Sequence, residues 1–173
     1  MMITTHALAG VYISQQVGHP AWAFFIGFLS HFLLDFIPHG DEYIAEWIHQ
    51  KNFKRRAFLI VFSDAAALSL FVVFLLYKIE LPQLSILLAG VIGAILPDIF
   101  DNVIGPPGSY LLSKHNYNKT LKKNNPIKSF IIRHNIFHSV VHNPFKKKMN
   151  TRAGIVVQLG LSVFLIVQII LGA

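Results

Sequence analysis

The sequence predicts an all-α, polytopic helical membrane protein with about four to five transmembrane helices and one short, buried or re-entrant helix that carries histidines. Of the 173 residues, 54% are hydrophobic and only 13% are charged, whereas a soluble domain carries about 25% charged residues. The mean hydropathy is +0.54, and the apolar residues form several separate runs. No repeat or linker divides the chain, so we expect residues 1–173 to form a single integral-membrane domain.

The first two expected helices form a hairpin. Residues 4–17 are apolar but short for a membrane span, and length leaves open whether this arm crosses the bilayer. Residues 20–37 begin with a proline at a helix-start position and are followed by Pro38, which predicts a spanning helix. The first ten residues contain no Lys or Arg, so we expect no cleaved signal peptide.

Three further runs, each about 20 residues long, match a hydrocarbon core about 30 Å thick. They are residues 57–77, 84–104 and 154–172. Between the last two lies a basic segment, residues 105–152, which we expect to be cytoplasmic. Within it, residues 127–142 are apolar nearly all round, which predicts a buried or re-entrant helix.

The positions of the basic residues predict the topology. Lys and Arg number 15, and all except Lys78 lie in the two connections that share one side of the expected membrane. Because loops rich in Lys and Arg stay in the cytoplasm, we expect a multi-pass protein of the cell membrane with this face inside. The same topology accounts for the net charge of +7, so the expected partner is the lipid bilayer and no nucleic acid is expected. Nothing in the sequence predicts an oligomeric state.

Ionisable side chains lie within the apolar segments, where they are costly unless they are paired, bind a metal or line water. Several are spaced three or four residues apart, which places them on one face of a helix. These are His31, Asp35 and His39, then Asp98 and Asp101, then His134, His138 and His142. Imidazoles and carboxylates at such spacings can converge on a divalent cation. All lie toward the expected cytoplasmic side, and His6 joins them if the first arm spans.

Each group also has a purely structural interpretation. His31 and Asp35 could form a polar pair that ties helices together, and Asp98 could cap the end of a helix. The nearby Asp101 argues against capping alone, because two neighbouring carboxylates repel each other without a cation. Asp64 faces either the same polar cavity or a helix–helix hydrogen bond, and the sequence leaves this choice open. The absence of cysteine excludes disulfides and thiolate zinc sites.

Three motifs together resemble the predicted membrane-bound, metal-dependent hydrolases, the family that includes the LexA-regulated inner-membrane protein. The first motif that resembles the family is HFLLDFIPH at 31–39. The second, GAILPDIFD at 93–101, looks like the family's G-x-x-x-P-D-x-D signature. The third, RHNIFHSVVH at 133–142, looks like its H-R-x-x-T-H-S signature. Phe100, Asn135 and Phe137 depart from these signatures. The resemblance implies metal ligation by His31, Asp35, Asp98, His134 and His138, with His6, His39 and Asp101 as further candidates.

We therefore expect a metal-dependent hydrolase that acts on an ester or phosphoester, with a lipid-linked substrate favoured by its location in the membrane. Mixed His and Asp ligands suit zinc, manganese or iron better than magnesium or calcium, and we expect zinc or manganese. Asp98, Asp101 or a histidine that does not bind the metal is the expected general base for a water activated by the metal. No G-x-S-x-G or Walker A motif supports a serine hydrolase or a P-loop enzyme.

The alternative is a non-enzymatic metal-binding or ion-conducting membrane protein. A conducting path needs polar groups along the full depth of the membrane. The run at 154–172 has only Gln158, Ser162 and Gln168 as larger polar groups. This distribution favours a site on one side of the membrane.

Overall fold

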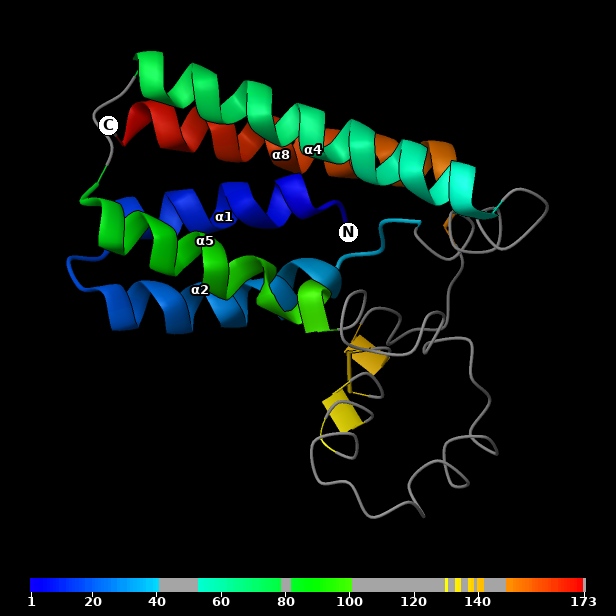
Figure 1. The fold of residues 1–173 in the computed structure, drawn as a ribbon, viewed down its shortest axis with the longest axis horizontal. Helices are drawn as coiled ribbons and strands as arrows, with labels where there is room; N and C mark the ends of the chain where they lie inside the picture. The colour runs from blue at the N-terminus through cyan, green and yellow to red at the C-terminus, as the bar shows by residue number, and fades with distance from the viewer. Residues whose placement is uncertain are drawn as a thin grey trace.

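The computed structural model describes residues 1–40, 53–78, 82–100 and 149–172, together with residues 130, 133–134, 137–138 and 140–141. The regular structure in these residues is helical and contains no strand, which confirms the predicted all-α class. The helices are α1 (Ile3–Gln16), α2 (Pro20–Asp35), α4 (Phe53–Lys78), α5 (Leu84–Ile99) and α8 (Thr151–Leu171). They run along one common direction, and α1 begins at the end of the bundle where α2 and α5 finish (Figure 1).

Local sequence signals explain where α2 and α8 begin. Pro20 occupies the first position of α2, where its missing N–H costs nothing, and the ring nitrogen Nδ1 of His19 accepts a hydrogen bond from the N–H of Ala21. At the start of α8, the side-chain oxygen of Asn150 accepts from the N–H of Arg152. The helix expected over 57–77 is longer in the structure, and the described part of the run at 84–104 is helical as far as Ile99.

Helix α1 lies at the centre of the bundle and contacts the other four helices. Every residue from Thr5 to Val11 is buried. Its 14 residues span only about 21 Å. A helix this short is marginally stable on its own, so α1 is stabilised mainly by packing against its neighbours. An apolar core joins α1 to α4 and α8 and consists of Leu8, Ala9, Val11, Phe71, Leu165 and Ile169.

Glycines allow α1, α2 and α5 to approach closely. A Cβ atom at Gly90 would lie 2.6 Å from the carbonyl oxygen of Gly10 on α1. A Cβ atom at Gly93 would overlap the carbonyl oxygen of Phe24 on α2. Residues larger than glycine at these points would force the backbones apart. The contact brings the start of α1 next to the ends of α2 and α5.

Asp64 of α4 caps the start of α1. Its carboxylate accepts hydrogen bonds from the backbone N–H groups of Ile3 at 2.7 Å and Thr4 at 3.2 Å, and from the hydroxyl of Thr4. The first N–H groups of a helix lack partners within the helix and carry partial positive charge, so a carboxylate there is stabilising. Asp64 therefore makes the helix–helix hydrogen bond that the sequence left open, and it fixes the turn that carries His6.

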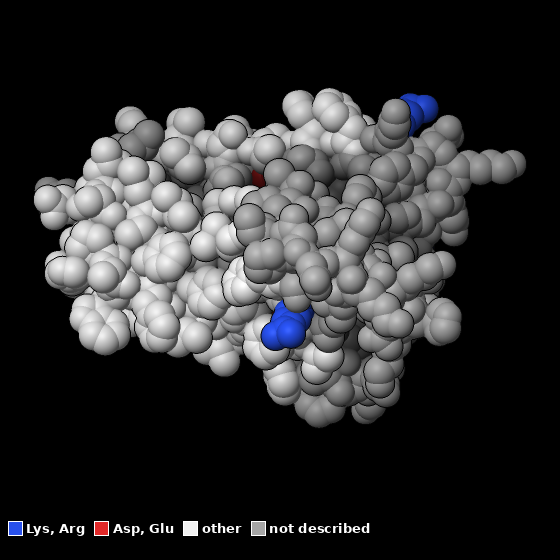
Figure 2. All heavy atoms as spheres, turned by 60° about the horizontal axis from the view of Figure 1, so that its bottom comes forward, with Lys and Arg blue, Asp and Glu red and all other residues white. Residues whose placement is uncertain are grey.

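Large apolar side chains cover much of the described surface. Helix α2 buries only Ala23, Gly27, His31 and Asp35, while its other faces expose large hydrophobic side chains. Among the residues that the structure describes, the left part of the molecule in Figure 2 shows no Lys, Arg, Asp or Glu. Among the described helices, α8 alone is long and apolar enough to cross a bilayer, and α2, α5 and residues 62–74 of α4 are apolar but shorter.

Candidate metal centre

Six of the predicted site residues meet at one end of the bundle, and all are buried. His6 lies near the start of α1, Asp98 lies at the end of α5, and the end of α2 supplies two more residues. The antiparallel packing of α1 against α2 and α5 brings these helix ends together (Figure 1). The buried set comprises His6, His31, Asp35, His39, Asp98 and His138.

Asp35 lies at the centre of this cluster, and its two oxygens face different imidazoles. Oδ2 lies 2.8 Å from Nε2 of His138 and 3.0 Å from Nε2 of His31. Oδ1 lies 3.2 Å from Nε2 of His6 and 4.0 Å from Nε2 of His39. A fully buried carboxylate is thus surrounded by four ring nitrogens, which is the donor chemistry of a divalent-metal site.

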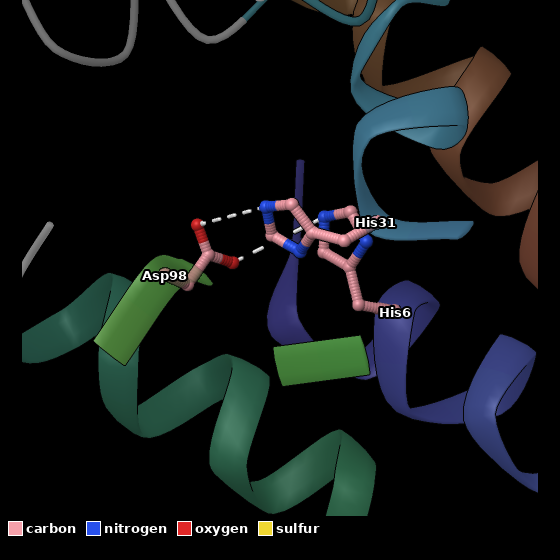
Figure 3. Close-up of side chains that lie close together, drawn as sticks. All are labelled: His6, His31 and Asp98. Atoms are coloured by element: carbon pink, nitrogen blue, oxygen red, sulfur yellow. Dashed lines mark ion pairs between the residues drawn. The ribbon is translucent and has the colours of Figure 1, made fainter. Parts of the chain in front are cut away.

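Asp98 faces the same cluster from α5. Its Oδ1 lies 3.9 Å from Nε2 of His31 and its Oδ2 lies 4.0 Å from Nε2 of His6 (Figure 3). The rings of His6 and His31 are stacked with their centroids 4.0 Å apart. Two overlapping groups can therefore hold a metal ion, with ligand atoms within 4.8 Å of one another: His6, His31 and Asp98, and His31, Asp35 and His138.

Backbone carbonyls orient two of the histidines. Nδ1 of His31 lies 2.8 Å from the carbonyl oxygen of Ala94, and Nδ1 of His39 lies 2.6 Å from that of Ile37. A carbonyl oxygen only accepts hydrogen bonds, so Nδ1 of each ring donates and, in the neutral ring, Nε2 keeps its lone pair. In both residues Nε2 faces Asp35. Histidines that bind metals usually donate their other ring nitrogen to an acceptor of this kind.

The spacing of the donor atoms fits a cation between them. Nε2 of His31 and Nε2 of His138 lie 3.0 Å apart. Because the neutral ring of His31 carries its proton on Nδ1, its Nε2 has no proton to donate across this contact. Both ring nitrogens of His6 are buried, and Nε2 lies 3.2 Å from Oδ1 of Asp35. Two ligands that are each about 2.1 Å from a tetrahedral zinc lie ~3.4 Å apart, close to the separations around Asp35. The buried His and Asp cluster could therefore hold a metal ion.

One residue that the sequence analysis did not assign to the site supports it from α8. The side-chain amide of Gln158 donates to the carbonyl oxygen of His39 at 2.9 Å, and its Oε1 accepts from the N–H of Met2 at 2.9 Å. Gln158 is buried. Its partners are more than 100 residues away in sequence, so no local pattern could have assigned this role.

His134 lies beside the cluster, on the face that its spacing predicted it to share with His138. Its ring centroid is 5.6 Å from that of Phe100, 6.3 Å from that of Phe32 and 5.9 Å from that of His138. Within the described residues, neither potential metal group includes His134. Asp101 lies outside the described residues, so its expected role as ligand or general base stays a prediction.

Most of the basic segment 105–152 also lies outside the described residues. The described part of the predicted histidine-bearing helix, between residues 130 and 141, is helical. It buries His138 and exposes Phe130, Arg133, Phe137 and Val140. Where it is described, this helix therefore buries His138 and exposes three large apolar side chains together with Arg133.

No family model, curated protein or solved structure matches this chain. The resemblance to membrane-bound, metal-dependent hydrolases thus stays a prediction from three motifs. Function has to be argued from the chemistry of the site, because a helical bundle alone is compatible with many functions.

Proposed function

We propose that the protein is a multi-pass membrane hydrolase whose buried cluster binds a divalent metal, zinc or manganese, and cleaves an ester or phosphoester at the cytoplasmic face. The observation that carries this proposal is the convergence of four imidazole nitrogens on the two oxygens of Asp35. A divalent metal bound there would lower the pKa of water and polarise a substrate oxygen.

Asp98 has a suitable position for the general base. It is slightly accessible, with 6% exposure against 0% for Asp35. Its oxygens lie 3.9 and 4.0 Å from the nearest imidazole nitrogens of the cluster, farther than the closest contacts of Asp35. A carboxylate that borders the ligands in this way can accept a proton from an attacking water. Asp101 remains the second candidate for this role.

The distribution of polar and apolar side chains supports placement in a membrane. The largest fully buried side chains are mostly polar and include His6, His31 and Gln158, while large hydrophobic side chains are exposed on α2, α4 and α8. Soluble monomers rarely expose apolar patches beyond a few hundred Å², whereas membrane proteins keep ionisable groups in the bundle interior. The exposed Arg55 and Arg152 lie in the first turns of α4 and α8. Both helices begin at the end of the bundle that carries the cluster (Figure 1). Basic residues favour the cytoplasmic side of a membrane, so their position supports a cytoplasmic site.

Exposed apolar residues next to the cluster support a lipid-linked substrate. Phe36 directly follows Asp35 and is 48% exposed, and Phe137 directly precedes His138 and is 55% exposed. In a bilayer these rings would meet lipid chains while the ligands face the bundle interior. A substrate with an acyl chain and an ester or phosphoester head could then reach the site from the membrane.

Hydrolysis should depend on both the metal and Asp98. We expect the detergent-purified protein to hydrolyse bis(p-nitrophenyl) phosphate or p-nitrophenyl acetate, to lose this activity with EDTA and to regain it with Zn²⁺ or Mn²⁺. Asp98→Asn should lower the rate about 100-fold or more, since general bases contribute about 10²- to 10⁴-fold. Metal content measured on the same sample distinguishes a base, which leaves the metal bound, from a ligand.

Ser30→Ala is the matched control, because the Ser30 hydroxyl bonds to the carbonyl of Gly27 within α2 and should not affect hydrolysis. Metal-loaded wild-type protein that cleaves neither compound, nor phospholipid in vesicles, would contradict the hydrolase. Such a result would favour the non-enzymatic metal-binding alternative.

The absence of cysteine makes the topology directly testable. We expect Gln83→Cys, before α5, to react with a membrane-impermeant maleimide in intact bacterial cells. Arg152→Cys, at the start of α8, should react in inverted vesicles, because the basic end is expected in the cytoplasm. Both positions are exposed in the structure. Labelling of both from one side would contradict the proposed number of spans between them.

A further inference from the structure

His138 reaches the candidate metal centre from a helical stretch that is separate from α1, α2 and α5. We call this stretch, which is described between residues 130 and 141, the histidine helix. Nε2 of His138 lies 2.8 Å from Oδ2 of Asp35 and 3.0 Å from Nε2 of His31. The potential metal group formed by these three residues therefore exists only while the histidine helix is held against α2.

Phe32 on α2 packs against one face of the histidine helix. Its ring centroid lies 5.3 Å from that of Phe137, 5.8 Å from that of His138 and 6.3 Å from that of His134. These three residues are spaced i, i+3 and i+4, which are neighbouring positions on the surface of a helix. The ring of Phe32 therefore lies against the side of the histidine helix that carries His138.

The geometry of these contacts is the one that aromatic rings prefer. The ring planes of Phe32 and His138 are at 90° to each other, and those of Phe32 and Phe137 are at 67°. An edge-to-face aromatic pair contributes about 2- to 12-fold to an equilibrium constant beyond the area that it buries. Phe32 is also edge-on to His31, with centroids 5.4 Å apart and planes at 78°. A single ring thus contacts two imidazoles whose Nε2 atoms face each other.

We propose that Phe32 is a positioning residue that holds the histidine helix against α2 and so keeps His138 at the metal site. This inference rests on the metal binding proposed above and assigns a role to a side chain that has no donor atom. Phe32 directly follows His31 and lies one turn before Phe36 on α2, so its ring starts from the turn that also carries Asp35. A ligand that is in place before the metal arrives has less freedom to lose on binding. Loss of the Phe32 ring should therefore weaken metal binding.

A phenylalanine with a purely structural role would behave differently, and Phe71 on α4 provides the comparison. Phe71 is buried in the apolar core that joins α4 to α1 and α8. Phe71→Leu should lower the melting temperature and leave the metal affinity unchanged. Phe32→Leu should lower the metal affinity about 10-fold or more, since changes to residues behind metal ligands typically lower it about 10- to 100-fold.

Co²⁺ is a suitable probe, because its visible absorption depends on the number and kind of its ligands. Metal-free, full-length protein in detergent is titrated with Co²⁺, which gives the affinity and the spectrum of the bound ion together. We expect the spectrum of Phe32→Leu to resemble that of His138→Ala, and the spectrum of Phe71→Leu to match that of the wild type. Phe32→Tyr keeps the ring and should keep the wild-type spectrum.

A double variant tests whether Phe32 acts through His138. If Phe32 only positions His138, removing its ring should cost nothing more once the imidazole is gone. The protein that carries both Phe32→Leu and His138→Ala should therefore bind Co²⁺ as tightly as His138→Ala alone. Losses of affinity that add in the double variant would show that Phe32 acts on the site independently of His138, and would overturn the proposal.

Phe137→Leu provides a second variant in case Phe32→Leu does not fold. Phe137 is 55% exposed, so its replacement should leave the bundle folded while it removes a ring that packs edge-on to Phe32. We expect the affinity for Co²⁺ to fall about 2- to 12-fold. Wild-type affinity and spectrum in Phe32→Leu, or in Phe137→Leu if the first variant does not fold, would overturn the positioning role and leave the metal site intact. No binding of Co²⁺, Zn²⁺ or Mn²⁺ to the wild-type protein would overturn both this inference and the proposed function.

Discussion

Asp35→Asn should abolish metal binding while the protein still folds. Asn has nearly the volume of Asp but lacks the negative charge, and its amide nitrogen cannot bind a metal. One of the two imidazole pairs that face Asp35 would thus lose its oxygen. Because changes even to residues behind the ligands typically lower affinity 10- to 100-fold, we expect a loss above about 100-fold here. Metal content after dialysis measures this effect.

Thermal unfolding gives a second measure of the same loss. A bound ligand stabilises the folded state, by about 2.7 kcal/mol when it is present at 100 times its dissociation constant. EDTA should therefore lower the melting temperature of metal-loaded wild-type protein and leave that of Asp35→Asn unchanged. Full metal content in Asp35→Asn would show that the cluster around this carboxylate is only a polar helix–helix contact.

Asp64→Asn is a carboxylate-matched control for Asp35→Asn. The oxygens of Asp64 accept hydrogen bonds from the N–H groups of Ile3 and Thr4, and the amide oxygen of Asn can still accept one of them. The variant should keep its metal and lose some stability, since caps of this kind are typically worth about 1 kcal/mol. Measuring metal content and thermal stability in both variants separates the loss of a metal ligand from the loss of a negative charge elsewhere in the bundle.

Hydropathy and helix-start signals predicted most of the helical structure. Pro20 predicted the start of α2. The apolar runs predicted most ends of α4, α5 and α8 to within a few residues. The pattern did not predict that α1 would be central. Its 14 residues read as a marginal span, and its burial depends on four neighbours that are distant in sequence.

Helical spacing also predicted much of the candidate site. His31 and Asp35 share a face because they are four residues apart, and the structure places them 3.0 Å apart. The same rule paired His134 with His138, and the structure places their ring centroids 5.9 Å apart, with the His134 ring also 5.6 Å from that of Phe100. Spacing indicates which residues share a face of a helix. It does not indicate which of them reaches a partner helix, because tertiary packing decides that.

Gly93→Leu should disrupt the bundle and the metal centre together. A Cβ atom at this position would overlap the carbonyl oxygen of Phe24 and lie 3.0 Å from its Cα atom, and a rigid helix backbone cannot give way as a side chain can. Overpacking typically costs about 1 to 3 kcal/mol and sometimes more. Separation of α2 from α5 would also break the contact between His31 and the carbonyl of Ala94. We expect a lower melting temperature and a loss of bound metal in the same variant.

Gly160→Leu on α8 distinguishes this clash from a general effect of replacing a helical glycine. A Cβ atom at Gly160 would meet nothing within 4 Å, and leucine favours a helix over glycine by several tenths of a kcal/mol, up to about 1 kcal/mol. The Gly160 variant should therefore be at least as stable as the wild type and should bind the same amount of metal. Equal stability and metal content in the Gly93 variant would mean that α2 and α5 do not meet at Gly93, and the placement of Asp98 opposite His31 would be wrong with it.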